Sequence, residues 1–174
     1  MNISNMPRTF GMGSGIQGLD QVLANLNKEI AAIKERSMKG LILSAAYIRN
    51  QTEHTPPLTP VDYGNLRSSW FVVTATSMPV GTSIQQFKGP KANELMVDHA
   101  NTLQEAQAMI KEKQTKEKSF IIIGYSANYG MWVHEMLGAN FQRPGAGPKW
   151  FESAIKRSIP MILRIIRDNA QIKK

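Results

Sequence analysis

The feature that most constrains this chain is a long one-sided apolar pattern that a proline-rich segment ends. Apolar residues recur at steps of three and four from Leu19 to Ile48, which is the spacing of a helix with one buried face. The segment TPPLTP, residues 55–60, follows, and proline lacks the amide proton that a helix needs. The sequence therefore predicts one long helix, or two joined near Gly40, that ends near His54.

The rest of the chain alternates strand-like and helix-like segments. Runs of β-branched and aromatic residues predict strands at 70–76 and 119–126, and a weaker strand at 80–87 that forms a hairpin with the first. Helical periodicity marks residues 91–113 and the C-terminal segment from Phe151 to Ala170. The predicted fold is α+β, with a long N-terminal helix, a small antiparallel β-sheet that contains an inserted helix, and a C-terminal helix packed on the sheet.

The domain organisation follows from the same segments. Residues 1–15 are rich in glycine and poor in apolar periodicity, so we expect a flexible N-terminal arm. Residues 16–174 form a single domain, with an insertion at about 77–118. A small sheet leaves strand edges unpaired, and oligomerisation is one way to cover such edges.

The composition argues against several classes of protein, namely those with disulfides, with thiolate metal sites or with membrane spans. The chain has no cysteine, which excludes disulfides and thiolate metal sites. It also has no apolar run of about 18 residues, so we expect no membrane span. The N-terminus lacks the pattern of a signal peptide, and we expect a protein that stays in the cytosol where it is made.

The net charge of +8 is concentrated near the C-terminus. Residues 143–174 carry eight basic and two acidic residues, a net +6. A solvated helix face is the commoner explanation of such an excess, and the alternative is contact with nucleic acid. The candidates for a weak DNA contact are Arg157, Arg164 and Arg167.

No pattern in the sequence predicts catalysis, a metal or a cofactor. Each histidine has an acidic neighbour, but residues adjacent in sequence point in different directions and cannot chelate one ion as an i, i+4 pair does. The segment HEMLG lacks the second histidine of the zinc-protease motif, although a hydrolase that uses His134 and Glu135 remains an alternative. No G-x-S-x-G motif occurs. In RPGAGPKW, residues 143–150, Pro148 removes an amide that an anion cradle would need.

The large aromatic residues lie within apolar patterns, so most of them are predicted to be in the core rather than on a base-stacking surface. These core predictions are Trp70, Phe71, Trp132, Trp150 and Phe151, whereas Tyr63 lies in a turn and is predicted to be a surface anchor.

Three segments, in this order, resemble the signatures of one known family. TPVDYGNLRSSW, residues 59–70, resembles the signature that follows the long N-terminal helix in the tail-completion, or neck, proteins that join head and tail in tailed bacteriophages. YSANYGMWVHEMLG, residues 125–138, is similar to the family's second signature, and RPGAGPKWFESAIKRS, residues 143–158, to its third. The match covers most of residues 15–170.

The resemblance implies a non-enzymatic virion protein of the phage neck, present in the host cytoplasm during assembly. Such a protein forms a hexameric ring, contacts the head connector or head-closure protein on one side and the tail terminator or tail tube proteins on the other, and leaves a channel for transient contact with DNA. No cofactor, metal or membrane is implied. The residues that the resemblance marks as motif and candidate interface positions are Pro60, Asp62, Gly64, Leu66, Arg67, Trp70, Tyr129, Glu135, Gly138, Arg143, Pro144 and Pro148.

Two of these positions carry specific expectations. Arg67 either bridges to an acidic group of a neighbouring subunit or caps a turn in its own chain. RPGAGPKW is interpreted as a stiff connector that sets the last helix against the sheet and can present Arg143 to a neighbouring subunit. In the first signature, Asp62 can accept backbone amides, Gly64 can adopt a left-handed conformation, and Leu66 and Trp70 can anchor the start of the strand.

Overall fold

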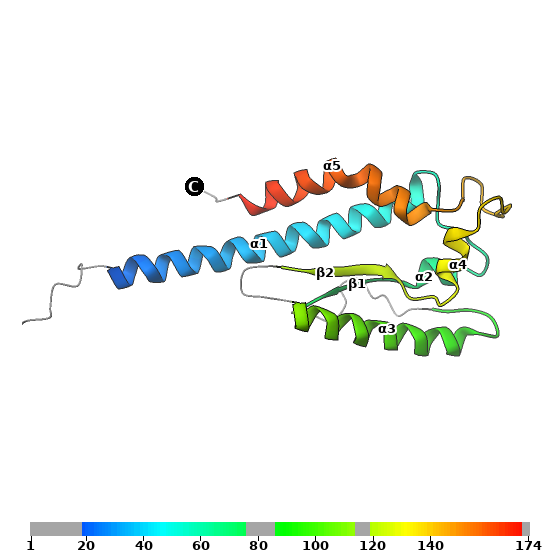
Figure 1. The fold of residues 1–174 in the computed structure, drawn as a ribbon, viewed down its shortest axis with the longest axis horizontal. Coiled ribbons are helices and arrows are strands. Elements are labelled where there is room, and N and C mark those ends of the chain that lie inside the picture. Colours follow the sequence, from blue (N-terminus) through cyan, green and yellow to red (C-terminus); the bar gives the residue numbers. More distant parts are fainter. Residues whose placement is uncertain (1–18, 76–85, 114–118, 172–174) are drawn as a thin grey trace, which may run out of the picture.

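The structure is a computed structural model that describes residues 19–75, 86–113 and 119–171. Its elements, in chain order, are α1 (Leu19–His54), α2 (Asn65–Ser68), β1 (Trp70–Thr74), α3 (Ala92–Lys113), β2 (Ile121–Tyr125), α4 (Gly130–Glu135) and α5 (Trp150–Ala170). They form a stack in which the sheet lies between α1 and α3, and α5 lies on the other side of α1 (Figure 1). The predicted α+β fold is confirmed.

The sheet within the described residues is an antiparallel pair, β1 with β2. Trp70 lies opposite Tyr125 at one end and Thr74 lies opposite Ile121 at the other. The predicted hairpin partner of β1, residues 80–87, falls almost entirely outside the described residues, as does the predicted flexible arm. Strand β2, which the sequence predicted at 119–126, is confirmed and is the strand that pairs with β1.

The helix α1 is continuous through Gly40, so one helix rather than two is present. A Cβ atom on Gly40 would lie 3.1 Å from Cα of Ile166, which means that the glycine allows the backbone of α5 to approach α1 closely. The helix α5 packs along α1, and its first turn reaches the sheet. There the ring of Phe151 lies edge-on to Tyr125, with centroids 5.6 Å apart.

Two clusters of buried apolar residues lie in the described part of the chain. One lies between the sheet and α3 and contains Phe71, Val73, Ala106 and Ile110. The other lies near the beginning of α5, where Leu66, Leu95, Ala127 and Trp150 pack together. The first cluster holds the sheet against α3, and the second joins α2 and α3 to the beginning of α5.

One of the predicted core residues is wrongly placed. Trp132 is 77% exposed on α4, whereas Phe71 and Trp150 are buried and Trp70 and Phe151 are half-buried. Trp132 lies in the short helix α4, Gly130–Glu135. The helix has only six residues, which is less than two turns. So short a helix leaves some of its apolar side chains without a packing partner, which explains the error.

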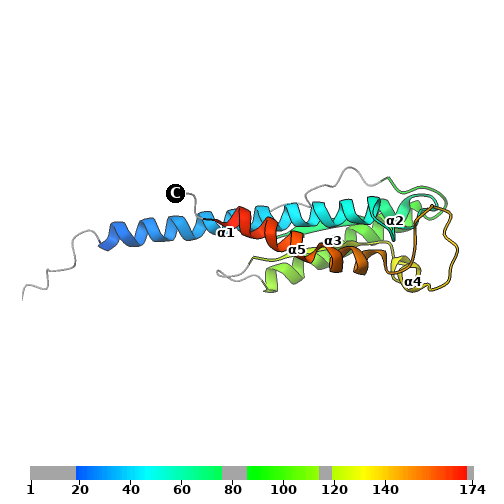
Figure 2. The same ribbon diagram turned by 90° about the horizontal axis from the view of Figure 1, so that it is seen from above.

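The N-terminal part of α1 extends beyond the other elements, as seen from above (Figure 2). Apolar side chains are exposed along it, at Val22, Leu23, Leu26 and Ile30. The apolar stripe that predicted this helix is therefore buried only in its second half, where α5 and the sheet cover it.

Candidate assembly site

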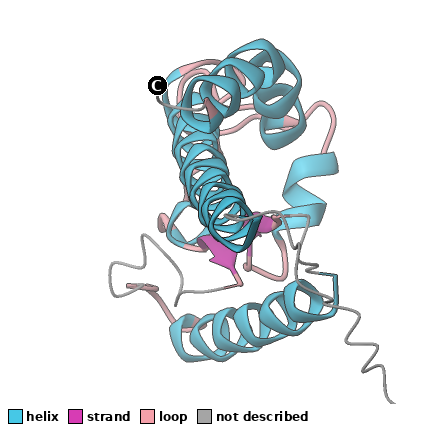
Figure 3. Ribbon diagram, turned by 90° about the vertical axis from the view of Figure 1, so that its left-hand side faces the viewer, coloured by secondary structure: helices cyan, strands magenta, loops and turns pink. Residues whose placement is uncertain are grey.

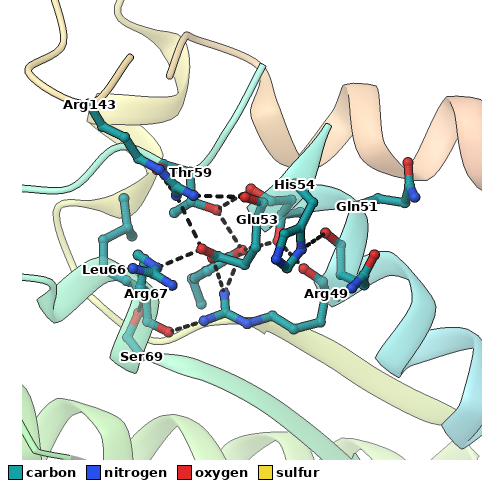
Figure 4. Close-up of polar contacts among 12 residues, drawn as sticks. Arg49, Gln51, Glu53, His54, Thr59, Leu66, Arg67, Ser69 and Arg143 are labelled. Atoms are coloured by element: carbon teal, nitrogen blue, oxygen red, sulfur yellow. Dashed lines mark hydrogen bonds and ion pairs between the residues drawn. The ribbon is translucent and has the colours of Figure 1, made fainter. Parts of the chain in front are cut away.

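A single buried carboxylate lies at the end of α1, where the helix meets the proline-rich segment. Glu53 is in the last turn of α1, and its side chain is 8% exposed. A buried carboxylate is stable in its charged form only when cations and hydrogen-bond donors replace the water that it loses. Three arginines provide this replacement (Figure 4).

The three arginines come from three different parts of the chain. Arg67 Nε lies 2.6 Å from Glu53 Oε2, Arg143 Nη1 lies 3.1 Å from the same oxygen, and Arg49 Nη1 lies 3.1 Å from Oε1. Arg49 is one helical turn before Glu53, Arg67 belongs to α2, and Arg143 begins the RPGAGPKW segment. One carboxylate therefore holds three separate segments together, and the cluster carries a net charge of +2.

Backbone carbonyls accept the remaining hydrogen bonds of the cluster. Arg143 donates to the carbonyl oxygens of Thr59 and Glu53 at 3.0 and 2.7 Å, and Arg49 donates to that of Arg67 at 2.7 Å. A guanidinium offers donors in a fixed planar fork, so several acceptors at fixed positions define its orientation. The cluster is thus a rigid joint between α1, α2 and the loop before α5.

Tyr125 extends this joint into the sheet. Its hydroxyl group donates to Thr52 Oγ1 at 3.0 Å, accepts from Arg49 at 3.0 Å, and lies 3.1 Å from Thr59 Oγ1. Its ring packs edge-on against Trp70, 5.3 Å away, and the guanidinium of Arg49 lies 5.5 Å from the Trp70 ring. Hydrogen bonds at one end and ring contacts at the other therefore fix the last residue of β2.

The RPGAGPKW segment is attached directly to the proline-rich segment after α1. Leu58 and Ala146 form a parallel bridge, in which Leu58 N donates to Gly145 O at 2.8 Å and Gly147 N donates to Leu58 O at 3.3 Å. Gly145 has φ +78°, and a Cβ on Gly147 would lie 3.2 Å from Pro57. Pro144 and Pro148 flank this bridge and fix φ at its two sides. The segment therefore aligns α5 by holding the loop at 56–58.

The end of the molecule formed by α4 carries the second signature. Glu135 contacts both Lys149 and His134, with His134 Nδ1 2.8 Å from Glu135 Oε1. The hydrogen bond from Lys149, and then that from His134, lowers the pKa of Glu135, while the bond to Glu135 raises the pKa of Lys149. Lys149 N also donates to His134 O at 2.8 Å, so this group fastens α4 to the beginning of α5.

A groove of about 320 Å³ separates the first signature from the second. Its walls are mainly apolar and include the motif residues Pro60, Asp62, Leu66 and Tyr129. Burial, and then the charge of Asp62, raises the pKa of the Tyr129 hydroxyl group. Tyr63, predicted to be exposed, is 62% exposed at the rim of this groove.

Gly64 of the first signature and Gly138 of the second adopt left-handed backbone conformations. Gly64 has φ +85° immediately before α2, as the sequence predicted, and Gly138 has φ +79° after α4. Apart from their chain neighbours, no atom of the described residues lies within 4 Å of a Cβ built on either glycine, so the backbone angle accounts for glycine at these positions.

Three of the candidate arginines have partners within their own chain. Arg67 and Arg143, the candidate contacts to a neighbouring subunit, both pair with Glu53 of their own chain, and a role within its own chain was one of the two alternatives for Arg67. Arg157 was a candidate DNA contact, but it donates to the backbone oxygens of Gln51, Thr55 and Pro56 at 2.6–2.9 Å. Each of these three arginines therefore has a role within the chain, either as a donor to backbone carbonyls or as a partner of the buried carboxylate.

The other candidate DNA contacts lie on the surface. The side chains of Arg164 and Arg167 are 66% and 70% exposed, and both approach Asp168, at 3.6 and 3.4 Å. The sequence did not single out Glu53, Arg49 or Tyr125, which together organise the site. A signal was available for one pair, because Arg49 and Glu53 are four residues apart on a predicted helix.

The described residues contain no group of three histidine, cysteine, aspartate or glutamate side chains that could hold a metal ion. Among the helices of the described part of the chain, none combines the length and apolarity that crossing a membrane requires. No protein-family model, no curated protein and no solved structure matches this chain.

Proposed function

We propose that this chain is a structural protein of the neck of a tailed phage, where it completes the tail, joins it to the head connector and leaves a channel for DNA. One observation carries the proposal. The three segments that resemble the family's signatures, residues 59–70, 125–138 and 143–158, converge on one end of the molecule although they are far apart in sequence. Tyr125 of the second segment contacts Thr59 of the first, and Glu53 at the end of α1 joins Arg67 of the first to Arg143 of the third.

The chemistry of this end favours an architectural role over a catalytic one. Glu53, its three arginines and Tyr125 direct their polar atoms toward one another and toward backbone carbonyls. A catalytic group has to reach a substrate, and reactive side chains generally lie in a cleft with that freedom. The cluster instead makes the three signature segments into one rigid unit.

An exposed apolar patch on the same end supports a protein partner. Met131, Trp132 and Leu137 are 77%, 77% and 75% exposed, and they lie on or just after α4. Exposed tryptophan and methionine are typical of the centres of protein interfaces. Under this proposal the patch binds the adjacent layer of the virion, either the head connector or head-closure protein or the tail terminator and tail tube proteins.

Electron microscopy of the purified protein tests the proposal. The expected result is a ring with a central hole, and labelled antibody is expected to bind mature particles at the head-proximal end of the tail. A second arm inactivates the gene in the phage that encodes it, and we expect filled heads and free tails that fail to join. A protein that stays monomeric at high concentration and is absent from mature particles would contradict the proposal.

A DNA-binding accessory protein is the second candidate function, because Arg164 and Arg167 are exposed on α5. Binding through these residues predicts retention of duplex DNA at low salt, with a salt dependence that weakens when both are changed to glutamine. A channel lining should hold DNA weakly, since each phosphate contact would resist its passage. The absence of DNA retention at low salt would exclude the accessory role and leave the neck role standing. A tail terminator of the same virion is the remaining alternative, and the position of the antibody label distinguishes it.

A further inference from the structure

The two outermost layers of the molecule are single helices on opposite sides of the fold. The helix α5 forms one outer layer and α3 the other, with α1 and the sheet between them (Figures 1 and 3). Each helix buries one side toward the interior and turns the other side outward. The fold therefore has two long outer surfaces, one on α5 and one on α3, that face in opposite directions.

The outer face of α5 combines apolar and basic side chains. Leu163 is 63% exposed and Ile159 is 49% exposed, and Lys156, Arg164 and Arg167 are exposed beside them. These residues recur at steps of three and four, which places them on one side of the helix. Across Trp150–Ala170 there are four basic and two acidic residues, a net charge of +2.

The outer face of α3 has the same apolar character and the opposite charge. Val97 and Met109 are 59% and 47% exposed, and Glu94 and Glu105 are exposed on the same side of the helix. Across Ala92–Lys113 there are four acidic and two basic residues, a net charge of −2, and both lysines are in the last turn. The two outer faces are thus complementary in charge and alike in exposed apolar surface.

We propose that the outer face of α5 in one copy of this chain packs against the outer face of α3 in the next copy. The proposal rests on the ring of the proposed function and identifies the contact that builds it. A contact between two different faces of the same chain is heterologous, and such contacts either close into a ring or continue as a filament. The occupant of each face is a second copy because the complementary surface is present on this chain itself.

The contact also gives Arg164 and Arg167 a role. Complementary charges at the edge of an apolar contact fix its register and favour the correct pair of faces over two like faces. Two α5 faces brought together would place arginines against arginines, and two α3 faces would place glutamates against glutamates. The charges therefore select the arrangement that continues around a ring.

Charge reversal tests the contact in solution. The first variant is Arg164→Glu with Arg167→Glu, the second is Glu94→Lys with Glu105→Lys, and the third combines all four changes. We expect each of the first two to raise the concentration at which oligomers form by at least about tenfold, because rim charges set specificity and each pair contributes modestly. The third variant should recover assembly, since the signs are exchanged on both faces.

The matched control makes the same change of charge away from both faces. Lys28→Glu with Lys39→Glu alters two exposed lysines of α1, and we expect no effect on assembly. Sedimentation velocity over a concentration series measures assembly at low salt, and circular dichroism checks that every variant is folded. A parent protein that stays monomeric, or reversals that act no more strongly than the control, would overturn the proposal.

Crosslinking tests which faces meet. Because the chain has no cysteine, Leu163→Cys and Val97→Cys can be introduced singly or together and treated with a short bismaleimide. A heterologous contact predicts a ladder of covalent oligomers for the double variant and none for either single variant. Dimers from a single variant would show that like faces meet and would overturn the proposal.

The outcomes separate this inference from the proposed function. Rings that form and ignore the charge reversals would refute the contact while leaving the neck role intact. Assembly that depends on the two faces, in a protein absent from phage particles, would refute the neck role while confirming the contact.

Discussion

Arg67 Nε and Glu53 Oε2 lie 2.6 Å apart, and this pair joins the first signature segment to the end of the long helix. The carboxylate is 8% exposed and the arginine side chain is 44% exposed, so the two partners do not contribute equally. Removing the carboxylate leaves three guanidinium groups close together without their shared anion, whereas removing Arg67 leaves two of the three cations in place.

We therefore expect Glu53→Gln to be much more destabilising than Arg67→Gln. Breaking a buried ion pair by removing one partner costs about 3–5 kcal/mol, and the value for Arg67 should be well below this because water screens its exposed part. Urea unfolding followed by circular dichroism measures both free energies. The control is Glu29→Gln, which removes a more exposed ion pair with Arg36 and should cost less than about 1 kcal/mol. Similar losses for Glu53→Gln and Glu29→Gln would show that the cluster does not support the fold.

Tyr125→Phe tests the polar end of the same joint. The substitution keeps the ring contacts with Trp70 and Phe151 and removes the hydroxyl group that links Thr52, Thr59 and Arg49. We expect a loss of about 1–3 kcal/mol in the free energy of unfolding, because buried polar partners are left without a hydrogen bond. Tyr63→Phe, at an exposed tyrosine, is the control and should change stability by less than about 0.5 kcal/mol.

Arg157→Gln separates a structural role from DNA contact. Arg157 donates to three backbone oxygens at the end of α1 and the segment after it, and burial lowers its pKa. Hydrogen bonds of a charged group contribute about 1.5–3 kcal/mol, so we expect a loss in that range for unfolding. Arg164→Gln, on the exposed side of α5, should leave stability nearly unchanged. A DNA affinity that falls for Arg157→Gln without a change in stability would contradict this assignment.

Gly40→Ala sets helix propensity against packing. Alanine is favoured over glycine inside a helix by about 1 kcal/mol, yet its Cβ would lie 3.1 Å from Cα of Ile166. The neighbour is backbone, which cannot rotate away, and overpacking of this kind costs about 1–3 kcal/mol. We expect net destabilisation and faster hydrogen exchange in α5. Asn25→Ala, on the exposed part of α1, is the control and should slightly raise the melting temperature.

We expect His99 to make the protein less stable in mild acid. Its Nδ1 lies 2.6 Å from Ser126 Oγ, and its Nε2 is buried and has no hydrogen-bond partner among the described residues. Burial lowers the pKa of His99 below its ordinary value, so the unfolded chain binds the proton more readily. The contribution of neutral His99 to the free energy of unfolding is thus fully present above about pH 6.5. It is lost as the pH falls below this value, with a slope of at most about 1.4 kcal/mol per pH unit. His99→Phe should flatten the dependence between pH 7.5 and 5, measured by urea unfolding. An unchanged slope would assign the effect to other groups.

The sequence predicted the elements with local signals and could not predict the partners that join them. The apolar stripe of α1, the β-branched run of β2 and the glycine at position 64 each have a pattern that short-range physics explains. Glu53 has no such pattern, since two of its three arginines lie fourteen and ninety residues away. Trp132 was misplaced for a related reason, because periodicity shows that a side chain is apolar but not whether another element covers it.

The link between residues 53–58 and 143–146 has a consequence for how the protein is made. Glu53 receives Arg143 and Leu58 pairs with Ala146, so these contacts form only after most of the chain has left the ribosome. Until then the apolar side of α1 that α5 covers has no partner, and contacts of such large sequence separation form slowly. We therefore expect that the nascent chain needs protection of this helix during synthesis, and that truncation before Arg143 yields an aggregating product instead of a smaller folded domain.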